Sequence, residues 1–179
     1  MSGRLVIVTG PPGAGKSTIS RRLSEAWPAE AALHIHSDDL WTYFTKGWIP
    51  PWESRSAAQN AVVTDAMAAQ AAVLATAYPV FFDGVVGPWF LQPFREAARR
   101  ADVGLDYLVL RPSRETTVGR GVSRQEHPMR DAEVIGRMWD QFSNLGDLET
   151  HAYDTSNLTI EQAVAGALEA LVAGDYRLA

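Results

Sequence analysis

Short hydrophobic runs alternate with longer stretches of helical periodicity along most of the chain. Continuous apolar runs, rich in β-branched and aromatic residues, predict buried strands at 5–9, 31–36, 80–83 and 105–110. Apolar residues at helical spacing predict helices at 19–27, 55–78, 88–100 and 135–142. A more polar run at 150–154 predicts an edge strand, and Thr159 caps a final helix through Ala173. This alternation predicts an α/β fold with a parallel sheet.

A glycine-rich loop with the pattern G-x-x-x-x-G-K-[S/T] follows the first predicted strand. Its residues are Gly10, Pro11, Pro12, Gly13, Ala14, Gly15, Lys16, Ser17 and Thr18. The glycines allow a tight turn that presents backbone N–H groups to phosphates, and the helix that follows adds its positive N-terminal end. In this pattern the lysine reaches the outer phosphates and the serine hydroxyl ligates Mg²⁺. The strand–loop–helix order therefore predicts a nucleoside triphosphate site.

Composition narrows the class of protein further. A chain of 179 residues fits a single domain, which we expect to span 1–179. Cysteine is absent, no apolar stretch approaches a membrane span, and the N-terminal run leads straight into the loop, unlike a signal peptide. We therefore expect a cytoplasmic location and no membrane partner, with a monomer and a homodimer both open. The net charge of −5 makes nucleic acid an unlikely partner.

Two aspartates, Asp38 and Asp39, follow the second predicted strand. The carboxyl ends of parallel strands face the crevice where such sheets bind ligands. An aspartate there can orient an attacking hydroxyl and accept its proton, or hold a Mg²⁺-bound water. Either residue could instead cap the next helix. We favour Asp38 for the chemistry and Asp39 as the cap or water ligand, with the reverse assignment open.

His34 and His36 share one face of the second predicted strand. Such a pair can bind a metal, but no third ligand is evident and Mg²⁺ prefers oxygen. We interpret both as packing or supporting residues.

The third predicted strand ends in Asp83 and Gly84, in the form of a Walker-B segment. Next to the phosphate loop, Asp83 can hold the water shell of Mg²⁺ from the side opposite Ser17, or contact an acceptor. Gly84 allows a ligand to approach the strand end closely. Trp89, shortly after it, is predicted to line the acceptor pocket.

An aromatic segment at about 40–60 is predicted to bind the acceptor. Trp41 fits a core helix, but Trp48 and Trp52 flank Pro50–Pro51, which breaks a helix. Partly exposed aromatic residues beside a polar centre are typical of small-molecule pockets. The alternative is a hydrophobic cover over the sheet edge. Arg55, at the start of the next helix, could meet an anionic acceptor or the transferred phosphate, or remain solvated.

Arginine is concentrated between 111 and 137, a segment that contains six arginines and four acidic residues. Arg120 and Arg124 are four positions apart and share a helical face. We predict a lid at about 112–130 whose guanidinium groups close over the triphosphate; the alternative is a solvated helix with internal salt bridges. Asp154 and Ser156, in the turn after the last strand, are expected to flank the nucleotide base; the alternative is that they only form the turn.

The chain resembles the small P-loop kinases related to gluconate kinase, shikimate kinase, chloramphenicol phosphotransferase and the nucleoside monophosphate kinases. The resemblance spans nearly the whole chain. It is carried by GPPGAGKST, HSDDLW, VFFDG, LRPSRETTVGRGVSR and YDTSNLTIEQAV. It implies a five-stranded parallel sheet of order 2-3-1-4-5 with helices on both faces, and ATP and Mg²⁺ as cofactors. By position, Asp38 matches the aspartate that these kinases use to orient or deprotonate the acceptor hydroxyl.

Two departures bear on the acceptor. Adenylate-type kinases follow the third strand with an arginine that grips a phosphorylated acceptor, whereas this chain has residues 85–89, VVGPW. Polynucleotide 5′-kinases have an arginine where this chain has Trp41. The sequence therefore predicts phosphoryl transfer to a hydroxyl of a small, non-phosphorylated molecule. A nucleoside or nucleoside monophosphate kinase, and a nucleotide-binding switch or ATPase, remain the alternatives.

Overall fold

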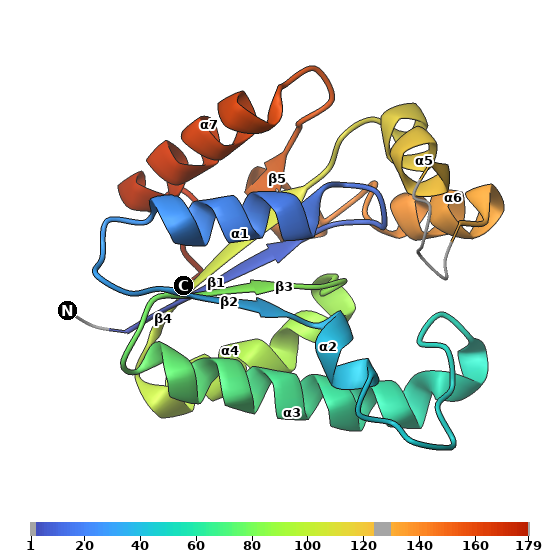
Figure 1. Cartoon of the computed structure of the whole chain (residues 1–179), viewed down its shortest axis with the longest axis horizontal. Coiled ribbons are helices and arrows are strands. Elements are labelled where there is room, and N and C mark those ends of the chain that lie inside the picture. The colour runs from blue at the N-terminus through green and yellow to red at the C-terminus, as the bar shows by residue number, and fades with distance from the viewer. Residues whose placement is uncertain (1–2, 124–129, 179) are drawn as a thin grey trace.

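Five parallel strands form the centre of the molecule (Figure 1). The computed structural model describes residues 3–123 and 130–178. The sheet order is β2-β3-β1-β4-β5, and every strand pair is parallel. This confirms the predicted fold class and strand order. The strands are β1 (Arg4–Thr9), β2 (Leu33–His36), β3 (Val80–Asp83), β4 (Gly104–Leu110) and β5 (Ala152–Tyr153).

A layer of helices covers each face of the sheet. Leu5 and Ile7 of β1 belong to the core beneath α3 and α4, whereas Val6 and Val8 belong to the core beneath α1 and α7. Figure 1 shows α3 and α4 on one side of the sheet and α1 and α7 on the other. Because the central strands are buried on both faces, their sequences are continuous apolar runs. The four helices are α1 (Lys16–Ala26), α3 (Ala57–Ala75), α4 (Leu91–Ala101) and α7 (Ile160–Ala173).

Shorter elements gather at the end of the sheet toward which the strands point (Figure 1). Helices α5 and α6 form one group there, and α2 with the segment before α3 forms another. The site described below lies between the two groups, at the carboxyl ends of the strands. The elements are α2 (Asp38–Trp41), η1 (Ser54–Ser56), η2 (Pro88–Phe90), α5 (Arg114–Val122), α6 (Ala132–Gln141) and η3 (Gly146–His151).

Two predicted elements differ from the structure at their ends. The strand expected at 150–154 is reduced to Ala152–Tyr153, because the preceding residues form η3, where buried His151 bonds the Tyr107 carbonyl through Nδ1 at 2.8 Å. The helix expected from Arg55 begins at Ala57 instead. Ser56 precedes it and directs its hydroxyl back to the carbonyls of 51 and 53, which fixes the turn of η1.

A buried ion cluster joins the chain ends at the far end of the sheet from the phosphate loop. Asp106 on β4 is fully buried; Arg4 Nε donates to its Oδ2 at 2.8 Å, and Arg177 Nε lies 3.3 Å from its Oδ1. The pairing compensates the cost of burying a carboxylate.

Within the described part of the chain, no helix is both long enough and apolar enough to cross a membrane.

Candidate active site

The phosphate loop connects β1 to α1 through backbone conformations that favour glycine. Gly13 and Gly15 both have a φ of 91°, and Gly15 is the N-cap of α1. A Cβ atom on Gly13 would lie 2.3 Å from the carbonyl oxygen of Thr117 on α5. The loop therefore packs directly on α5, in the tight glycine turn expected of a phosphate cradle.

Lys16 and Ser17 begin α1 at the mouth of this loop. The Lys16 side chain is buried, and its Nζ donates to the Pro11 carbonyl at 3.1 Å, across the loop. Pro12 and Ala14 are also buried, whereas Thr18 is exposed at the rim. The ammonium group therefore lies over the turn in which phosphates would be held.

A cluster of four polar side chains lies beside the loop. Ser17 Oγ donates to Asp83 Oδ1 at 3.0 Å, and His36 Nδ1 lies 2.8 Å from the same oxygen. His34 Nε2 contacts the other carboxylate oxygen of Asp83. The parallel register pairs His36 with Asp83, which explains how β2 and β3 bring these groups together. The structure thus places the two residues expected to hold Mg²⁺ in direct contact.

Asp83 is the electrostatic centre of this cluster. Its burial favours the neutral acid, but the hydrogen bonds from His34 and His36 outweigh burial and hold the pKa of Asp83 well below its usual range. The same hydrogen bond raises the pKa of His36 against partial burial, with further contributions from the charges of Asp83, Asp38 and Asp39. At neutral pH Asp83 is therefore an ionised carboxylate that only accepts hydrogen bonds.

Asp38 and Asp39 occupy the first turn of α2 but point to different surroundings. Asp38 Oδ2 lies 3.7 Å from His36 Nε2, which faces the cluster around Asp83. Asp39 lines a small pocket of about 170 Å³ between β2, α2 and α3. The expectation that one of them caps the helix is wrong, because the N-cap is Ser37. Asp38 therefore lies beside the imidazole whose Nδ1 is 3.5 Å from the Oγ of Ser17 in the phosphate loop.

A cavity of about 390 Å³ adjoins the phosphate loop on the side of α7. Arg120 and Thr155 both line it. Thr155 is 2 % exposed, and its Oγ1 has no hydrogen-bond partner among the described residues. Asp154 and Ser156, the predicted base-flanking residues, are bonded to each other, since Asp154 Oδ1 accepts from the Ser156 amide at 2.8 Å; their contact with a base stays a prediction. Sequence reasoning therefore missed Thr155, although the turn that contains it was singled out.

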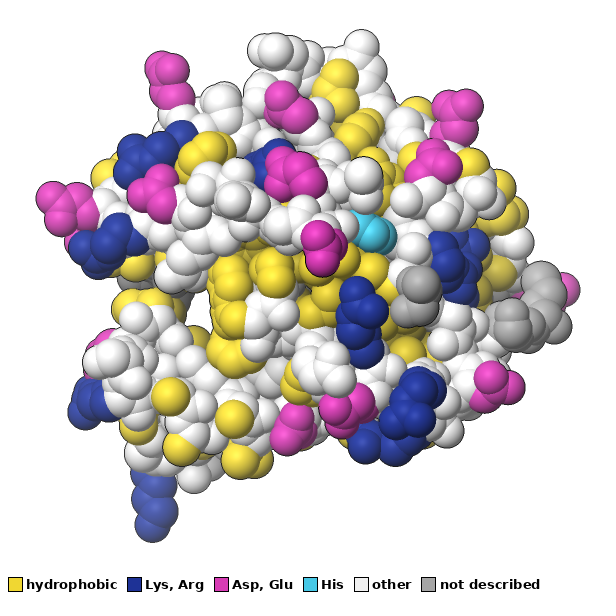
Figure 2. Space-filling model, turned by 180° about the vertical axis from the view of Figure 1, so that it is seen from behind, with side chains coloured by type: hydrophobic (Ala, Val, Ile, Leu, Met, Phe, Trp, Pro, Cys, Tyr) yellow, Lys and Arg dark blue, Asp and Glu magenta, His cyan; other side chains and the backbone are white. Residues whose placement is uncertain are grey.

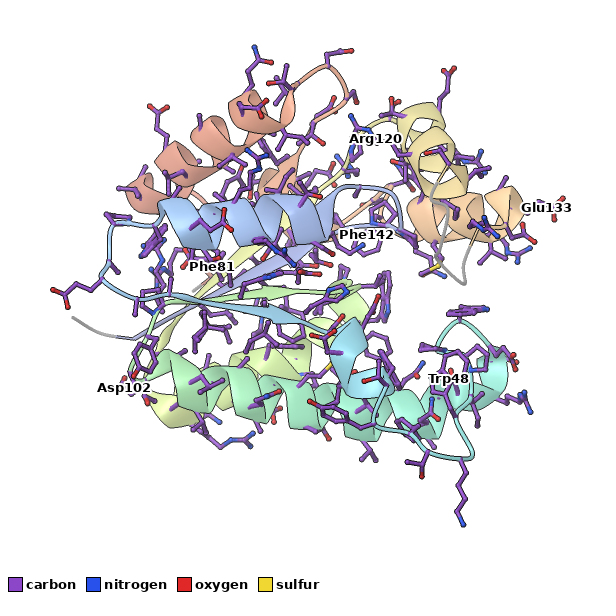
Figure 3. All side chains as sticks on the ribbon, in the orientation of Figure 1. Trp48, Phe81, Asp102, Arg120, Glu133 and Phe142 are labelled. Atoms are coloured by element: carbon purple, nitrogen blue, oxygen red, sulfur yellow. The ribbon has the colours of Figure 1, made fainter. Side chains whose placement is uncertain are left out.

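The two arginines predicted to close over the phosphates have different outcomes. Arg120 extends from α5 toward the loops of the α1–α7 side, and Figure 3 shows it there. Arg124 lies outside the described residues. Two other arginines of this region are paired with acidic residues that follow it in the sequence: Arg111 pairs with Glu149, and Arg114 Nε lies 3.1 Å from Asp140 Oδ1. The lid at 112–130 stays a prediction.

Two tryptophans stand on the segment between α2 and η1, and we call Trp48 and Trp52 the aromatic platform. Their ring centroids are 6.1 Å apart in an edge-to-face arrangement, and both side chains are about two-fifths exposed. Gln59 on α3 holds the loop by exchanging two hydrogen bonds with the backbone of Ile49, at 2.7 and 3.0 Å. Asn60 adds a bond to the Pro51 carbonyl at 2.8 Å. Figure 3 shows Trp48 on this loop, beside the start of α3.

Trp89 provides a second exposed aromatic surface. Its ring packs edge-to-face on Phe142, with the ring centroids 5.4 Å apart. The ring also lies close to Gly87, where a Cβ atom would be 2.3 Å from the Cη2 atom of Trp89. Figure 2, seen from behind the view of Figure 1, shows hydrophobic side chains gathered in a hollow between the upper and lower layers. Two exposed apolar surfaces thus belong to the site end of the fold.

The remaining predicted acceptor residues have local roles in the structure. Trp41 is half-buried and stacks on Phe44. Gly84 lies close to Ser37, because a Cβ atom at position 84 would be 2.6 Å from the Oγ of Ser37. Arg55 Nε lies 2.5 Å from a carboxylate oxygen of Glu53, so its charge is paired.

A comparison with family models shows to which protein family the chain belongs. The model of the AAA domain family AAA_33 matches residues 5–145. The chain belongs to the AAA_33 family. No curated protein matches the sequence.

Solved structures similar to this AAA_33 domain share its fold. A sugar kinase from Janibacter sp. HTCC2649 has a TM-score of 0.69 at 18% identity, with 95% of each chain covered. A gluconokinase from Sinorhizobium meliloti 1021 has a TM-score of 0.68 at 20% identity, covering 96% of this chain and 93% of that one. A shikimate kinase from Acinetobacter baumannii has a TM-score of 0.66 at 19% identity, covering 98% and 95%. The AAA_33 domain therefore has the fold of small-molecule P-loop kinases.

Proposed function

We propose that this AAA_33 protein is an ATP- and Mg²⁺-dependent phosphotransferase that moves the γ-phosphate to a hydroxyl of a small, non-phosphorylated molecule. The observation that carries the proposal is the position of Asp38. Its carboxylate lies one imidazole ring away from the Ser17–Asp83 pair, at the end of the phosphate loop. A nucleotide-binding switch has no need of a second carboxylate at this place, whereas an alcohol acceptor does.

The residues fit Mg²⁺ in the chemistry of their donors. Ser17 and Asp83 offer oxygen ligands, which this cation prefers. Within 3–123 and 130–178 no group of three or more Asp, Glu or His side chains could hold a metal ion. Mg²⁺ would therefore take its other ligands from phosphate and water, as it commonly does. When bound, it neutralises charge on the phosphates.

The transfer itself needs little covalent chemistry from the protein. The oxygen of the acceptor hydroxyl forms a bond to the γ-phosphorus, the bond from that phosphorus to the β–γ bridging oxygen breaks, and ADP leaves with the electron pair. The hydroxyl proton passes to the Asp38 carboxylate late in the step and then to solvent. Lys16 and the loop amides hold the phosphates, and Arg120 stabilises charge in transit.

The surroundings of the acceptor favour a neutral molecule. Arg55 is paired with Glu53, which leaves its charge compensated. The exposed aromatic platform and Trp89 offer apolar faces rather than anion-binding groups. Stacking on such faces suits a sugar ring, an aromatic antibiotic or another alcohol with a flat apolar side.

ADP release with a panel of alcohols tests the proposal. The panel contains sugars, aminoglycoside- and chloramphenicol-type alcohols, nucleosides and nucleoside monophosphates. We expect a non-phosphorylated alcohol to stimulate ADP release and to gain one phosphate by mass spectrometry. The Asp38→Asn variant should bind Mg·ADP normally and lose at least about 10²-fold in turnover. Stimulation by nucleoside monophosphates alone would favour a nucleotide kinase, and no stimulation by any acceptor would contradict the proposal.

A further inference from the structure

We infer that Tyr107 and Thr9 are positioning residues for the acceptor side of the site. Their buried hydroxyl groups hold the backbone of Val86 and thereby fix where the turn that follows places Trp89. The inference rests on the proposed function, which makes Trp89 part of the acceptor surface. Neither Tyr107 nor Thr9 stands out in the sequence, where both belong to runs that predict buried strands.

The connection between β3 and η2 consists of residues 84–87, two valines between two glycines. Neither glycine has a side chain that could anchor the connection. The bond from the Gly84 amide to the Val8 carbonyl is 3.4 Å long, beyond the usual range of a backbone hydrogen bond. The connection therefore needs a further anchor, and Val86 provides it.

Both backbone groups of Val86 bond to buried side chains. Its amide donates to Thr9 Oγ1 at 2.9 Å, and its carbonyl accepts from Tyr107 Oη at 2.7 Å. Thr9 and Tyr107 are both fully buried. Because burial raises the pKa of Tyr107, its hydroxyl stays protonated and remains a donor. We call these two hydrogen bonds the Val86 clamp.

The clamp connects the acceptor side to the strand that carries the phosphate loop. Thr9 is the last residue of β1 and directly precedes that loop, whereas Tyr107 lies on β4 opposite Ile7. Residues 7 and 9 share one face of β1, and Ile7 and Tyr107 belong to the core beneath α3 and α4. The two hydroxyls thus reach Val86 from two central strands. A rigid support of this kind keeps an acceptor in register with the phosphoryl donor.

Trp89 follows Val86 by three residues and depends on the path of the chain between them. A Cβ atom at Gly87 would lie 2.3 Å from the Trp89 ring, and the Phe90 amide bonds to the Gly87 carbonyl at 2.9 Å. The ring also contacts Phe142. Because the indole packs against its own turn, a shift of the connection moves the indole relative to the phosphate loop.

Two variants each remove one hydroxyl and nearly preserve the shape of the side chain: Tyr107→Phe and Thr9→Val. Tyr176→Phe is the matched control, because this buried tyrosine belongs to the core on the opposite face of the sheet. Each hydroxyl that is removed leaves a buried backbone group of Val86 without its partner. Both clamp variants should therefore lower the melting temperature by about 2–12 °C.

A spectroscopic readout reports the position of Trp89 without any ligand. The chain has six tryptophans, and in protein labelled with 5-fluorotryptophan the Trp89 resonance is the one that Trp89→Ala removes. We expect Tyr107→Phe and Thr9→Val to shift or broaden this fluorine resonance by more than its line width and to leave that of Trp48 unchanged. Tyr176→Phe should leave both resonances unchanged.

The kinetic readout uses the alcohol of the panel that stimulates ADP release most. Tyr107→Phe should lower kcat/KM for this alcohol about tenfold and keep the dissociation constant of Mg·ADP, measured by calorimetry, within about twofold. In a Trp89→Ala background, Tyr107→Phe should cost less than about threefold more, because the effects of coupled residues do not add.

The outcomes separate the clamp from the proposed function. If Tyr107→Phe lowers the melting temperature but leaves the Trp89 resonance and kcat/KM unchanged, the hydroxyl serves stability alone and the inference is wrong. If Mg·ADP binding weakens as much as kcat/KM, the clamp acts on the donor side and the inference is again wrong. If no alcohol stimulates ADP release, the proposed function fails and the role toward an acceptor fails with it, whether or not the Trp89 resonance moves. Thr9→Val provides the independent test should Tyr107→Phe fail to fold.

Discussion

Replacing Gly13 or Gly15 by alanine offers a matched test of how the phosphate loop is held. Both residues have a φ of 91°, so alanine pays the same backbone penalty at either position, about 1–2 kcal/mol. Their surroundings differ. The new Cβ atom at Gly13 would lie 2.3 Å from the Thr117 carbonyl, whereas at Gly15 the nearest heavy atom is Ile19 Cδ1 at 3.9 Å. Only Gly13→Ala must displace the backbone of α5.

The extra cost of Gly13→Ala is that of overpacking, about 1–3 kcal/mol. For a chain of this size, the difference lowers the melting temperature of Gly13→Ala below that of Gly15→Ala by about 2–12 °C. Urea unfolding without nucleotide, followed by tryptophan fluorescence, measures both free energies of unfolding. Equal values for the two variants would refute the packing of the loop on α5. Because α5 carries Arg120, we also expect Gly13→Ala to weaken ADP binding.

Three further predictions address the cavity, the platform and the histidine. Thr155→Val removes a buried hydroxyl that has no hydrogen-bond partner within residues 3–123 and 130–178. This variant should leave the melting temperature unchanged or raised, and initial rates should show a KM for ATP that is several-fold higher. Trp48→Ala should raise the KM for the acceptor while the melting temperature stays within about 2 °C, because the indole is 41 % exposed; a large loss of stability would assign the ring to the core. The pKa of His36 is raised in the folded protein, so its stabilising contribution is fully present below about pH 6.5 and is lost as pH rises through the folded-state pKa. Urea titrations at several pH values should show this decline in the wild-type protein and a shallower one in His36→Asn.

The sequence predicts the elements whose signals are local. The phosphate loop follows from its glycine spacing and its flanking strand and helix. The last helix begins where expected, with Thr159 and Gln162 forming a reciprocal capping box. The sheet order came from resemblance to known kinases, not from periodicity. Each of these features depends on residues close together in the sequence or on a motif of fixed spacing.

Features that depend on register between strands were not predictable in the same way. The contact of His36 with Asp83 joins residues 47 positions apart and exists because β2 and β3 pair with these two side by side. Two histidines alternating on a strand next to a strand that ends in aspartate were the available signal. The shortness of β5 depends on His151, whose buried ring bonds to the backbone of β4. Its sequence neighbours do not reveal that contact.

Helix α3 fixes the backbone of the loop that carries Trp48 and Trp52 without depending on these two side chains. Gln59 and Asn60 bond to main-chain atoms of residues 49 and 51, and among the described residues no hydrogen bond of this loop involves an indole nitrogen. The backbone scaffold is therefore indifferent to the side chains at 48 and 52. Other aromatic residues, or small polar residues, can therefore replace Trp48 and Trp52 without loss of the hydrogen bonds that hold the loop. Such a loop gives evolution, or an engineer, an exchangeable recognition surface beside a fixed phosphoryl donor.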